Sequence, residues 1–225
     1  MGSSRLPGKV LLAIGKHTLL EHIFCRVARS LSGAELVVAT TELPEDDAIV
    51  EASRRHGVPM FRGEKLNVLD RYFQCALVNG FQHIVRLTAD NPFVDIEEMD
   101  HLIHLHLKEQ ADFSYSFNSL PIGCGAEVFS FNALEKSHRE GHDAHHIEHV
   151  DEFILDNIAQ FSVRSLDVPV SKNKPQVRLT VDTPDDYARA CFIVDHANMD
   201  HITTEEAIAL AMAFDTQRSS KESGR

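Results

Sequence analysis

Short apolar runs alternate along the chain with longer segments whose apolar residues recur at helical spacing. Residues 18–31 carry leucine, isoleucine, phenylalanine and valine at such positions and predict the first helix. Residues 35–40, ELVVAT, have the composition of a buried strand, and the acids at 45–47 favour the start of a second helix that Gly57 ends. This alternation predicts an α/β fold in which helices flank a mainly parallel sheet.

The alternation continues to the end of the chain, with one looser stretch that predicts a small lobe at about residues 112–165 of a single domain, residues 1–216. The polar residues 217–225 predict a disordered tail. The further expected strands lie near residues 59–61, 82–88, 112–117, 126–129 and 177–181. The further expected helices lie near residues 67–79, 96–109, 132–139 and 144–156, with two more from about residues 184 and 204.

Composition limits the class of partner. The chain has 225 residues, 43% of them hydrophobic, which is enough for one sizeable core. The formal net charge of −12 argues against nucleic acid as a partner, because sequence-independent binders need a basic face to displace counterions. The expected ligand is small, and Arg5, Lys9 and Lys16 give the N-terminal region a basic character that suits an anion.

The cysteines and the apolar runs indicate a cellular setting. The cysteines at 25, 75, 124 and 191 lie far apart with no C-x-x-C spacing, so we expect reduced core thiols rather than a zinc or redox pair. No apolar run approaches the roughly 20 residues of a membrane helix, and the N-terminus lacks the apolar stretch of a signal peptide. We therefore expect a cytoplasmic protein without a membrane partner.

The loop of residues 2–9, GSSRLPGK, has the chemistry of a phosphate-binding segment. Gly2 and Gly8 allow close backbone approach, Ser3 and Ser4 offer hydroxyl donors, and Arg5 and Lys9 supply positive charge. The spacing is not that of a Walker A loop. From composition alone, a solvated N-terminal tail explains the same residues equally well.

Two aspartates follow expected strands. Asp90 comes after the strand at 82–88, and Asp182 comes after the strand at 177–181. Ligands of open parallel sheets collect at the carboxyl ends of strands, where such side chains converge. Each aspartate also precedes a proline-containing turn that leads to a helix, so helix capping is the competing interpretation.

Several segments resemble, in order, the motifs of the sugar cytidylyltransferases, which include the CMP-acylneuraminate, CMP-pseudaminate and CMP-Kdo synthetases. The similarity is greatest to the spore coat polysaccharide SpsF-like branch and covers nearly the whole chain. Besides the loop, the matching segments are Ala39-Thr40, Glu45-Asp-Asp47, Phe61-Arg-Gly63, Val68-Leu-Asp-Arg-Tyr72, Val85-Arg-Leu-Thr-Ala-Asp-Asn-Pro92, Gly125-Ala-Glu-Val-Phe129 and Arg178-Leu-Thr-Val-Asp-Thr-Pro184.

The resemblance implies a Rossmann-like fold of the nucleotide-diphospho-sugar transferase type and a CTP-dependent reaction. A sugar or 2-keto sugar acid attacks the α-phosphate of CTP and gives a CMP-sugar and pyrophosphate. Lys9, Arg5 and Asp90 are then the expected catalytic residues, and Asp90 and Asp182 the expected Mg²⁺ ligands. The expected nucleotide-binding residues are Gly2, Ser3, Ser4, Arg5, Gly8, Lys9 and Arg71.

Arg86, Glu127 and His149 are the expected acceptor-binding residues. Arg71 and Arg86 could equally form structural ion pairs, and Glu127 could be an ordinary strand glutamate. The chain has Ile147 and Asp151 where the family carries an arginine and a threonine around Glu148-His149-Val150. The acceptor is therefore either an uncharged sugar or an acid bound by another residue such as Arg86. The sequence leaves open whether two copies of the chain form a homodimer.

Other interpretations are weighed against these. A GT-A glycosyltransferase is disfavoured because Asp90-Asn-Pro92 lacks the D-x-D motif, and a non-catalytic nucleotide-binding protein stays open. His145-His-Ile-Glu-His149 satisfies the H-x-x-E-H zinc pattern. With 14 histidines in the chain such pairings arise by chance, and the third ligand is not identifiable among His142, His146, His101, His104 and His106. We expect no zinc peptidase site.

The resemblance also bears on the start of the chain. The family places a hydrophobic strand directly before the loop, and nothing precedes Met1 in this sequence. Without that strand, its neighbours are expected to carry unpaired backbone groups beside an exposed apolar slot. We expect Met1 to be an internal residue of a longer chain, which translation of the upstream reading frame tests.

Overall fold

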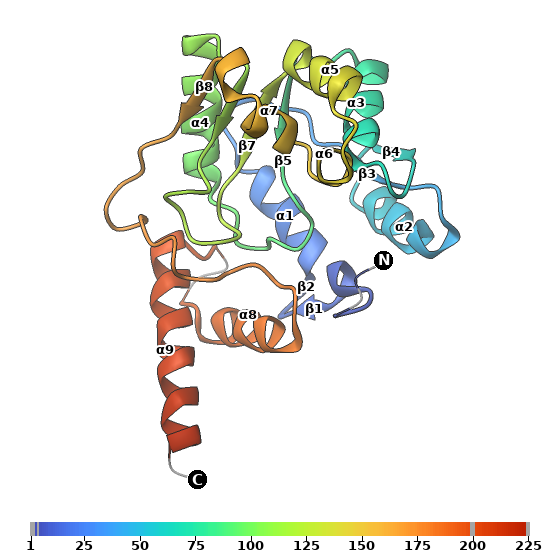
Figure 1. Ribbon diagram of the computed structural model, residues 1–225. Helices are drawn as coiled ribbons and strands as arrows, with labels where there is room; N and C mark the ends of the chain where they lie inside the picture. The colour runs from blue at the N-terminus through green and yellow to red at the C-terminus, as the bar shows by residue number, and fades with distance from the viewer. Residues whose placement is uncertain (1–2, 4, 199–200, 224–225) are drawn as a thin grey trace.

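Helices pack around short strands in the computed structural model, which describes Ser3, residues 5–198 and residues 201–223 (Figure 1). The helices are α1 (Leu19–Val27), α2 (Asp47–Arg55), α3 (Val68–Asn79), α4 (Ile96–Glu109), α5 (Phe131–Glu140), α6 (Ala144–Glu148), α7 (Glu152–Asp156), α8 (Pro184–His196) and α9 (Thr204–Ser223), with the 3₁₀ turns η1 (Lys9–Leu11), η2 (Pro44–Asp46) and η3 (Ile158–Gln160). The strands are β1 (Ala13–Ile14), β2 (His17–Thr18), β3 (Val38–Thr41), β4 (Met60–Gly63), β5 (His83–Arg86), β6 (Phe113–Tyr115), β7 (Glu127–Ser130) and β8 (Val163–Ser165).

Side-chain caps fix the beginnings of the main helices. Thr18 forms a capping box with Glu21 at α1, and Asn67 accepts a hydrogen bond from the Asp70 amide at α3. Asp95 caps α4 through the Glu98 amide. These caps satisfy amide groups that have no partner within a helix, and they place the helix starts close to where the sequence predicts them.

The strands form separate groups with mixed pairing. β3 pairs with β4 in parallel, and the larger sheet has the order β5-β7-β6-β8. In that sheet β7 runs antiparallel to both β5 and β6, whereas β8 runs parallel to β6. The predicted α/β fold is confirmed, but the described strands form a mixed arrangement rather than a mainly parallel one.

An apolar slot separates β3 from β5. Among the described residues, β3 pairs only with β4 and β5 only with β7, so the edges that face the slot have no strand partner. The slot has a volume of about 610 Å³, and its walls include Leu20 and Phe24 of α1, Val38 of β3, and Ile84 and Leu87 of the β5 segment. This slot does not contradict the expectation that a central strand is missing.

Separate core clusters hold the layers together. Phe113, Phe129 and Leu134 are completely buried where α3 and α5 cover the larger sheet. Leu19 and Ile193 are completely buried in a second cluster, which joins α1 to α8 and α9. Because this second cluster includes residues from both ends of the chain, it fixes the N-terminal loop against the segment that leads into α8.

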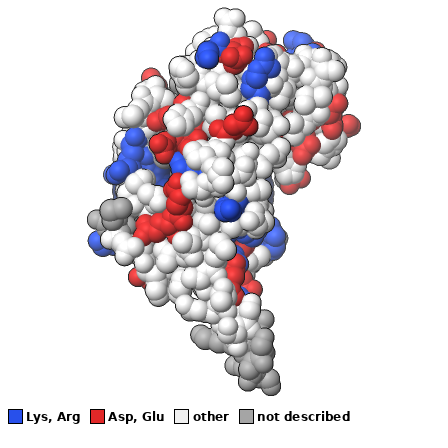
Figure 2. Space-filling view, turned by 90° about the vertical axis from the view of Figure 1, so that its left-hand side faces the viewer, with Lys and Arg blue, Asp and Glu red and all other residues white. Residues whose placement is uncertain are grey.

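Charged side chains are interspersed on the face drawn in Figure 2, where Lys and Arg lie beside Asp and Glu. A separate group of charges surrounds the buried Lys172, whose ammonium lies 3.1 Å from Asp95, 2.7 Å from Glu97 and 2.9 Å from Glu98. These three acids lie at the start of α4, so Lys172 stabilises the packing of the segment between β8 and α8 against that helix. Within the described residues, no helix is both long and apolar enough to cross a bilayer.

Three expected elements in the first half of the chain or at its end differ from the structure. The first helix ends at Val27 rather than at residue 31, and Leu31 is 93% exposed. The strand expected at 35–40 spans Val38–Thr41, the residues that face β4. The expected disordered tail is wrong for residues 217–223, because α9 continues to Ser223. Ion pairs from α8, Arg189 to Asp215 and Asp185 to Arg218, support that extension.

The looser stretch and the last predicted strand also need correction. The single helix expected at 144–156 is wrong: the chain breaks between α6 and α7, where Val150 turns into the core with 0% exposure. Residues 177–181 form an isolated bridge to Ile122 instead of a strand, because their backbone hydrogen bonds are divided between Ile122 and Asp90. Strand β8 is not predicted. Cys25 is exposed, contrary to the expectation of core thiols.

Candidate active site

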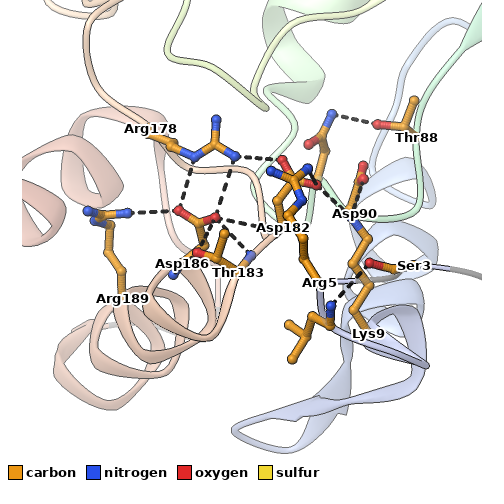
Figure 3. Close-up of polar contacts among 12 residues, drawn as sticks. Ser3, Arg5, Lys9, Thr88, Asp90, Arg178, Asp182, Thr183, Asp186 and Arg189 are labelled. Carbon is orange, nitrogen blue, oxygen red and sulfur yellow. Dashed lines mark hydrogen bonds and ion pairs between the residues drawn. The ribbon is translucent and has the colours of Figure 1, made fainter.

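Lys9 joins two aspartates that lie far apart in the sequence (Figure 3). Its ammonium lies 2.7 Å from Oδ2 of Asp90 and 2.7 Å from Oδ1 of Asp182. Burial by itself would lower the pKa of Lys9, but hydrogen bonds and charges from Asp182 and Asp90 outweigh it and hold that pKa above its ordinary value. Burial would likewise raise the pKa of Asp182, yet Lys9 and Arg178 hold it low. Each of these shifts favours the charged form of its group, Lys9 as an ammonium and Asp182 as a carboxylate.

Local backbone structure places each of these side chains. Gly8 adopts a left-handed conformation with φ 69° immediately before the turn η1, which begins at Lys9. The amide of Val181 donates a 2.9 Å hydrogen bond to the carbonyl of Asp90. This bond brings the two aspartate segments side by side, so their carboxylates converge on one point although residues 177–181 form no strand.

The remainder of the predicted loop lies beside this point. Arg5 approaches Oδ1 of Asp182 to 3.6 Å, and its side chain is 65% exposed and free to reach a ligand in solvent. The Ser3 hydroxyl accepts a hydrogen bond from the Leu6 amide at 3.3 Å, which curls the loop back on itself. Gly2 and Ser4 lie outside the described residues.

The competing interpretation, that Asp90 and Asp182 cap helices, is wrong. The cap of α4 is Asp95, and the cap of α8 is Thr183, which forms a capping box with Asp186. Asp90 lies five residues before the cap Asp95, and Asp182 lies one residue before the cap Thr183. The carboxylates of both aspartates contact Lys9 instead.

Arg178 and Asp186 support the site and were given no role by sequence reasoning. Arg178 lies 2.5 Å from Oδ2 of Asp182 and donates through Nε to Asp186 at 3.0 Å. Asp186 also accepts from the backbone amides of Asp182 and Thr183. The network holds the Asp182 carboxylate with one oxygen toward Lys9. Arg178 lies in a matching segment of the sequence, but only its contacts reveal this function.

Arg71 does not contact Lys9, Asp90 or Asp182 among the contacts of the described residues. Its guanidinium donates to the carbonyls of Glu64 at 2.7 Å and Lys65 at 3.4 Å, and its side chain lines the apolar slot. Arg62, in the matching segment 61–63, donates to the carbonyls of Thr41 and Leu43. These contacts of both arginines stabilise loops, so the expected nucleotide role of Arg71 stays a prediction.

Arg86 and Glu127 meet because β5 and β7 pair with these two residues in register. Their side chains form a 2.7 Å ion pair, and Asp151 lies 3.9 Å from the same guanidinium nitrogen. Burial would lower the pKa of Arg86, but the charge of Glu127 outweighs it and raises that pKa. Of the three expected acceptor-binding residues, these two lie together, whereas His149 is an exposed residue at the end of α6.

Burial is the largest influence on Glu127 and raises the pKa of its carboxyl to about 7, with Arg86 opposing and Asp151 reinforcing the shift. The folded protein therefore binds this proton more tightly than the unfolded chain does. We expect its stabilising contribution to be complete below pH 4.5 and to be lost as the pH rises to about 7. The loss is about 3 kcal/mol at most.

Chemical denaturation of the wild type and of Glu127→Gln between pH 4 and 8 measures this contribution. The wild type should lose stability relative to Glu127→Gln across that interval. Glu135→Gln, which changes an exposed glutamate on α5, serves as the control and should follow the wild type. Parallel pH profiles for wild type and Glu127→Gln would contradict the shifted pKa.

The residues around Lys9 fit a divalent cation. The Lys9 ammonium lies 2.7 Å from a carboxylate oxygen of Asp90 and 2.7 Å from one of Asp182, so two anionic oxygens already converge on one positive charge. Oδ1 of Asn91 is buried and has no hydrogen-bond partner among the described residues, while its amide nitrogen donates to Thr88. Two carboxylates and a free amide oxygen are the oxygen ligands that Mg²⁺ accepts alongside water and phosphate.

Comparison with known proteins identifies the class of enzyme. The cytidylyltransferase family model matches residues 1–218. The chain is 37% identical over 192 residues to the spore coat polysaccharide biosynthesis protein SpsF of Bacillus subtilis, covering 83% of this chain and 80% of that protein. It is also similar to the solved structure of a cytidylyltransferase from Leptospira borgpetersenii, with a TM-score of 0.85 and 29% identity over 97% of this chain and 92% of that one.

A CMP:2-keto-3-deoxy-manno-octonic acid synthetase, solved in complex with CTP, has the same fold, with a TM-score of 0.64 and 16% identity over 84% of this chain and 92% of that chain. By its family model and its relatives, the protein is thus a nucleotidyltransferase. The chain belongs to the cytidylyltransferase family, and its resemblance to the SpsF-like branch is confirmed.

Proposed function

We propose that this protein transfers CMP from CTP to a hydroxyl of a sugar or sugar acid, releasing pyrophosphate, and that the product serves surface polysaccharide or glycan biosynthesis. The observation that carries the proposal is the convergence of Asp90 and Asp182 on the Lys9 ammonium at 2.7 Å each. Family membership supplies the reaction class, and the similarity to the spore coat polysaccharide biosynthesis protein of B. subtilis supports a role in polysaccharide synthesis.

In this proposal, the loop binds the triphosphate and the aspartates hold Mg²⁺. Lys9 and the exposed Arg5 neutralise phosphate oxygens, and Arg178 keeps Asp182 oriented. Magnesium, when bound, offsets the charge that develops on the transferring and leaving oxygens. The acceptor hydroxyl attacks the α-phosphorus and loses its proton to solvent, the bond to the bridging oxygen breaks, and pyrophosphate takes the electron pair. The protein contributes mainly position and electrostatics.

The charge around Arg86 bears on the acceptor. Arg86 already pairs with Glu127 at 2.7 Å, and Asp151 lies 3.9 Å away, so two acids surround one cation. A sugar carboxylate would have to displace Glu127 and approach Asp151. This balance favours an uncharged sugar, whose hydroxyls Glu127 can orient, over a sugar acid.

A pyrophosphate-release assay tests the proposal. The protein is incubated with Mg²⁺, one of the four NTPs, and one acceptor from a panel of neutral sugars and 2-keto sugar acids. We expect release only with CTP, and more with a neutral acceptor. Release with a sugar acid alone would contradict the argument from Asp151, without affecting the reaction class.

Two other outcomes would overturn the proposed reaction. Stabilisation of the fold by CTP without pyrophosphate release from any acceptor would indicate a non-catalytic nucleotide-binding protein. Release of a nucleoside diphosphate from a nucleotide-sugar would indicate a glycosyltransferase. Thermal unfolding with and without each nucleotide, run beside the assay, separates loss of binding from loss of turnover.

A further inference from the structure

A histidine–carboxylate cluster lies at α6, away from the Lys9 contacts. Asp143, His145 and His146 each place a ligand atom within 4.8 Å of the other two. Asp156, at the end of α7, lies 2.8 Å from Nε2 of His145 and 3.0 Å from Nε2 of His146. Four side chains from the two short helices thus meet in one place, which we call the α6 cluster.

His146 is the unusual member of the α6 cluster because it is 94% buried, with 6% of its surface exposed. Its Nε2 contacts Asp156, and its Nδ1 is buried with no hydrogen-bond partner among the described residues. A carboxylate only accepts hydrogen bonds, so Nε2 carries a proton, and in the neutral imidazole Nδ1 then presents a lone pair. That lone pair faces Oδ2 of Asp143 across 3.9 Å.

A lone pair opposite a carboxylate leaves two electron donors facing each other with nothing between them. An ordinary hydrogen bond does not resolve the contact, because 3.9 Å exceeds its range. A metal ion does, because zinc binds a histidine nitrogen at about 2.0–2.1 Å and a carboxylate oxygen at about 2.0–2.2 Å. The 3.9 Å between Nδ1 of His146 and Oδ2 of Asp143 is slightly less than the sum of these two bond lengths, so an ion between the atoms would bind both at a wide angle. Asp143 is exposed, so its side chain can move closer to His146.

We propose that Asp143, His145 and His146 bind one divalent transition-metal ion of the zinc type. Two imidazole ligands select such an ion over Mg²⁺ and Ca²⁺, which prefer oxygen. Three protein ligands leave a further position for water. The set differs from the H-x-x-E-H pattern, because α6 ends at Glu148 and His149 has an extended backbone rather than a place on the helical face of His145.

Asp156 is a positioning residue in this site. Histidines that bind a metal usually donate their other ring N–H to a carboxylate, which fixes the tautomer and the ring orientation. Asp156 contacts Nε2 of both histidines in that manner. Through these hydrogen bonds Asp156 joins the end of α7 to the histidines of α6.

Cobalt titration of the untagged, chelator-treated protein tests the site. We expect one Co²⁺ per chain with strong visible absorption, displaced by Zn²⁺ and not by excess Mg²⁺. Asp143→Asn and His145→Ala alter exposed side chains, so the fold should tolerate them. Each should weaken Co²⁺ binding by at least about 100-fold, and Asp156→Asn by about 10- to 100-fold at unchanged stoichiometry.

His104→Ala, which removes an exposed histidine from α4, is the matched control and should bind Co²⁺ like the wild type. Thermal unfolding of each variant verifies that it is folded. The proposal is overturned if the wild type takes up no stoichiometric Co²⁺ or Zn²⁺, or if Asp143→Asn and His145→Ala bind the ion as tightly as the wild type. Because the titration uses no nucleotide, its result is independent of the proposed transferase function.

Discussion

Asp182→Asn and Asp90→Asn are each expected to lower the rate of CTP-dependent pyrophosphate release by about 100- to 1,000-fold or more. Asparagine keeps the shape of the side chain but removes one of the two negative charges that converge at 2.7 Å on Lys9. The proposed magnesium site would then lose an anionic ligand, and the transferring phosphate would lose a fixed counter-ion. The measurement is turnover at saturating CTP over a range of Mg²⁺ concentrations.

Asp185→Asn is the control for this pair. Asp185 lies three residues from Asp182, is exposed, and pairs with Arg218 on α9 instead of with the loop. We expect turnover close to that of the wild type. Near-normal turnover in Asp182→Asn or in Asp90→Asn would remove that residue from the proposed catalytic role, and equal unfolding midpoints would exclude a folding defect as the cause of a loss.

Lys9→Met is expected to have opposite effects on turnover and on metal binding. Without the ammonium, the triphosphate loses a positive partner, and turnover should fall by about 100- to 1,000-fold. The same change frees the carboxylate oxygens of Asp90 and Asp182, which Lys9 contacts at 2.7 Å in the absence of nucleotide. Mn²⁺, used as a probe for Mg²⁺, should therefore bind the nucleotide-free variant about 10-fold more tightly or better.

Isothermal titration with Mn²⁺ measures the second effect, and Lys108→Met, on the exposed surface of α4, is the control. Equal Mn²⁺ affinity in the wild type and Lys9→Met would mean that the ammonium and the metal do not share the aspartates. Unchanged turnover in Lys9→Met would exclude Lys9 from the reaction. The two measurements are separable because the titration contains no CTP.

Some contacts of the candidate site follow from local sequence rules. The expectation that Asp90 lies just past a strand is met, because β5 ends at Arg86 and the chain then turns toward α4. The expectation that Asp182 lies beside Asp90 is met, but the strand expected to place it there does not form. Residues 177–181 form no strand, and a single backbone bond from Val181 to Asp90 brings the two segments together.

Other contacts have no signal in the chain. The pairing of Arg86 with Glu127 depends on the register of β5 against β7, and a shift by one residue would separate them. Arg178 acquires its function only because its side chain reaches both Asp182 and Asp186. The break between α6 and α7 depends on the burial of Val150, which outweighs the helical pattern of the surrounding residues.

The sequence by itself determined the α/β class, most helix positions and the family, because periodicity, caps and ordered motifs are local properties of the chain. Only the tertiary structure decided the mixed strand pairing, the open slot between β3 and β5, and the meeting of Lys9 with Asp90 and Asp182. These features depend on contacts between residues as many as 173 positions apart, for which no local pattern in the chain exists.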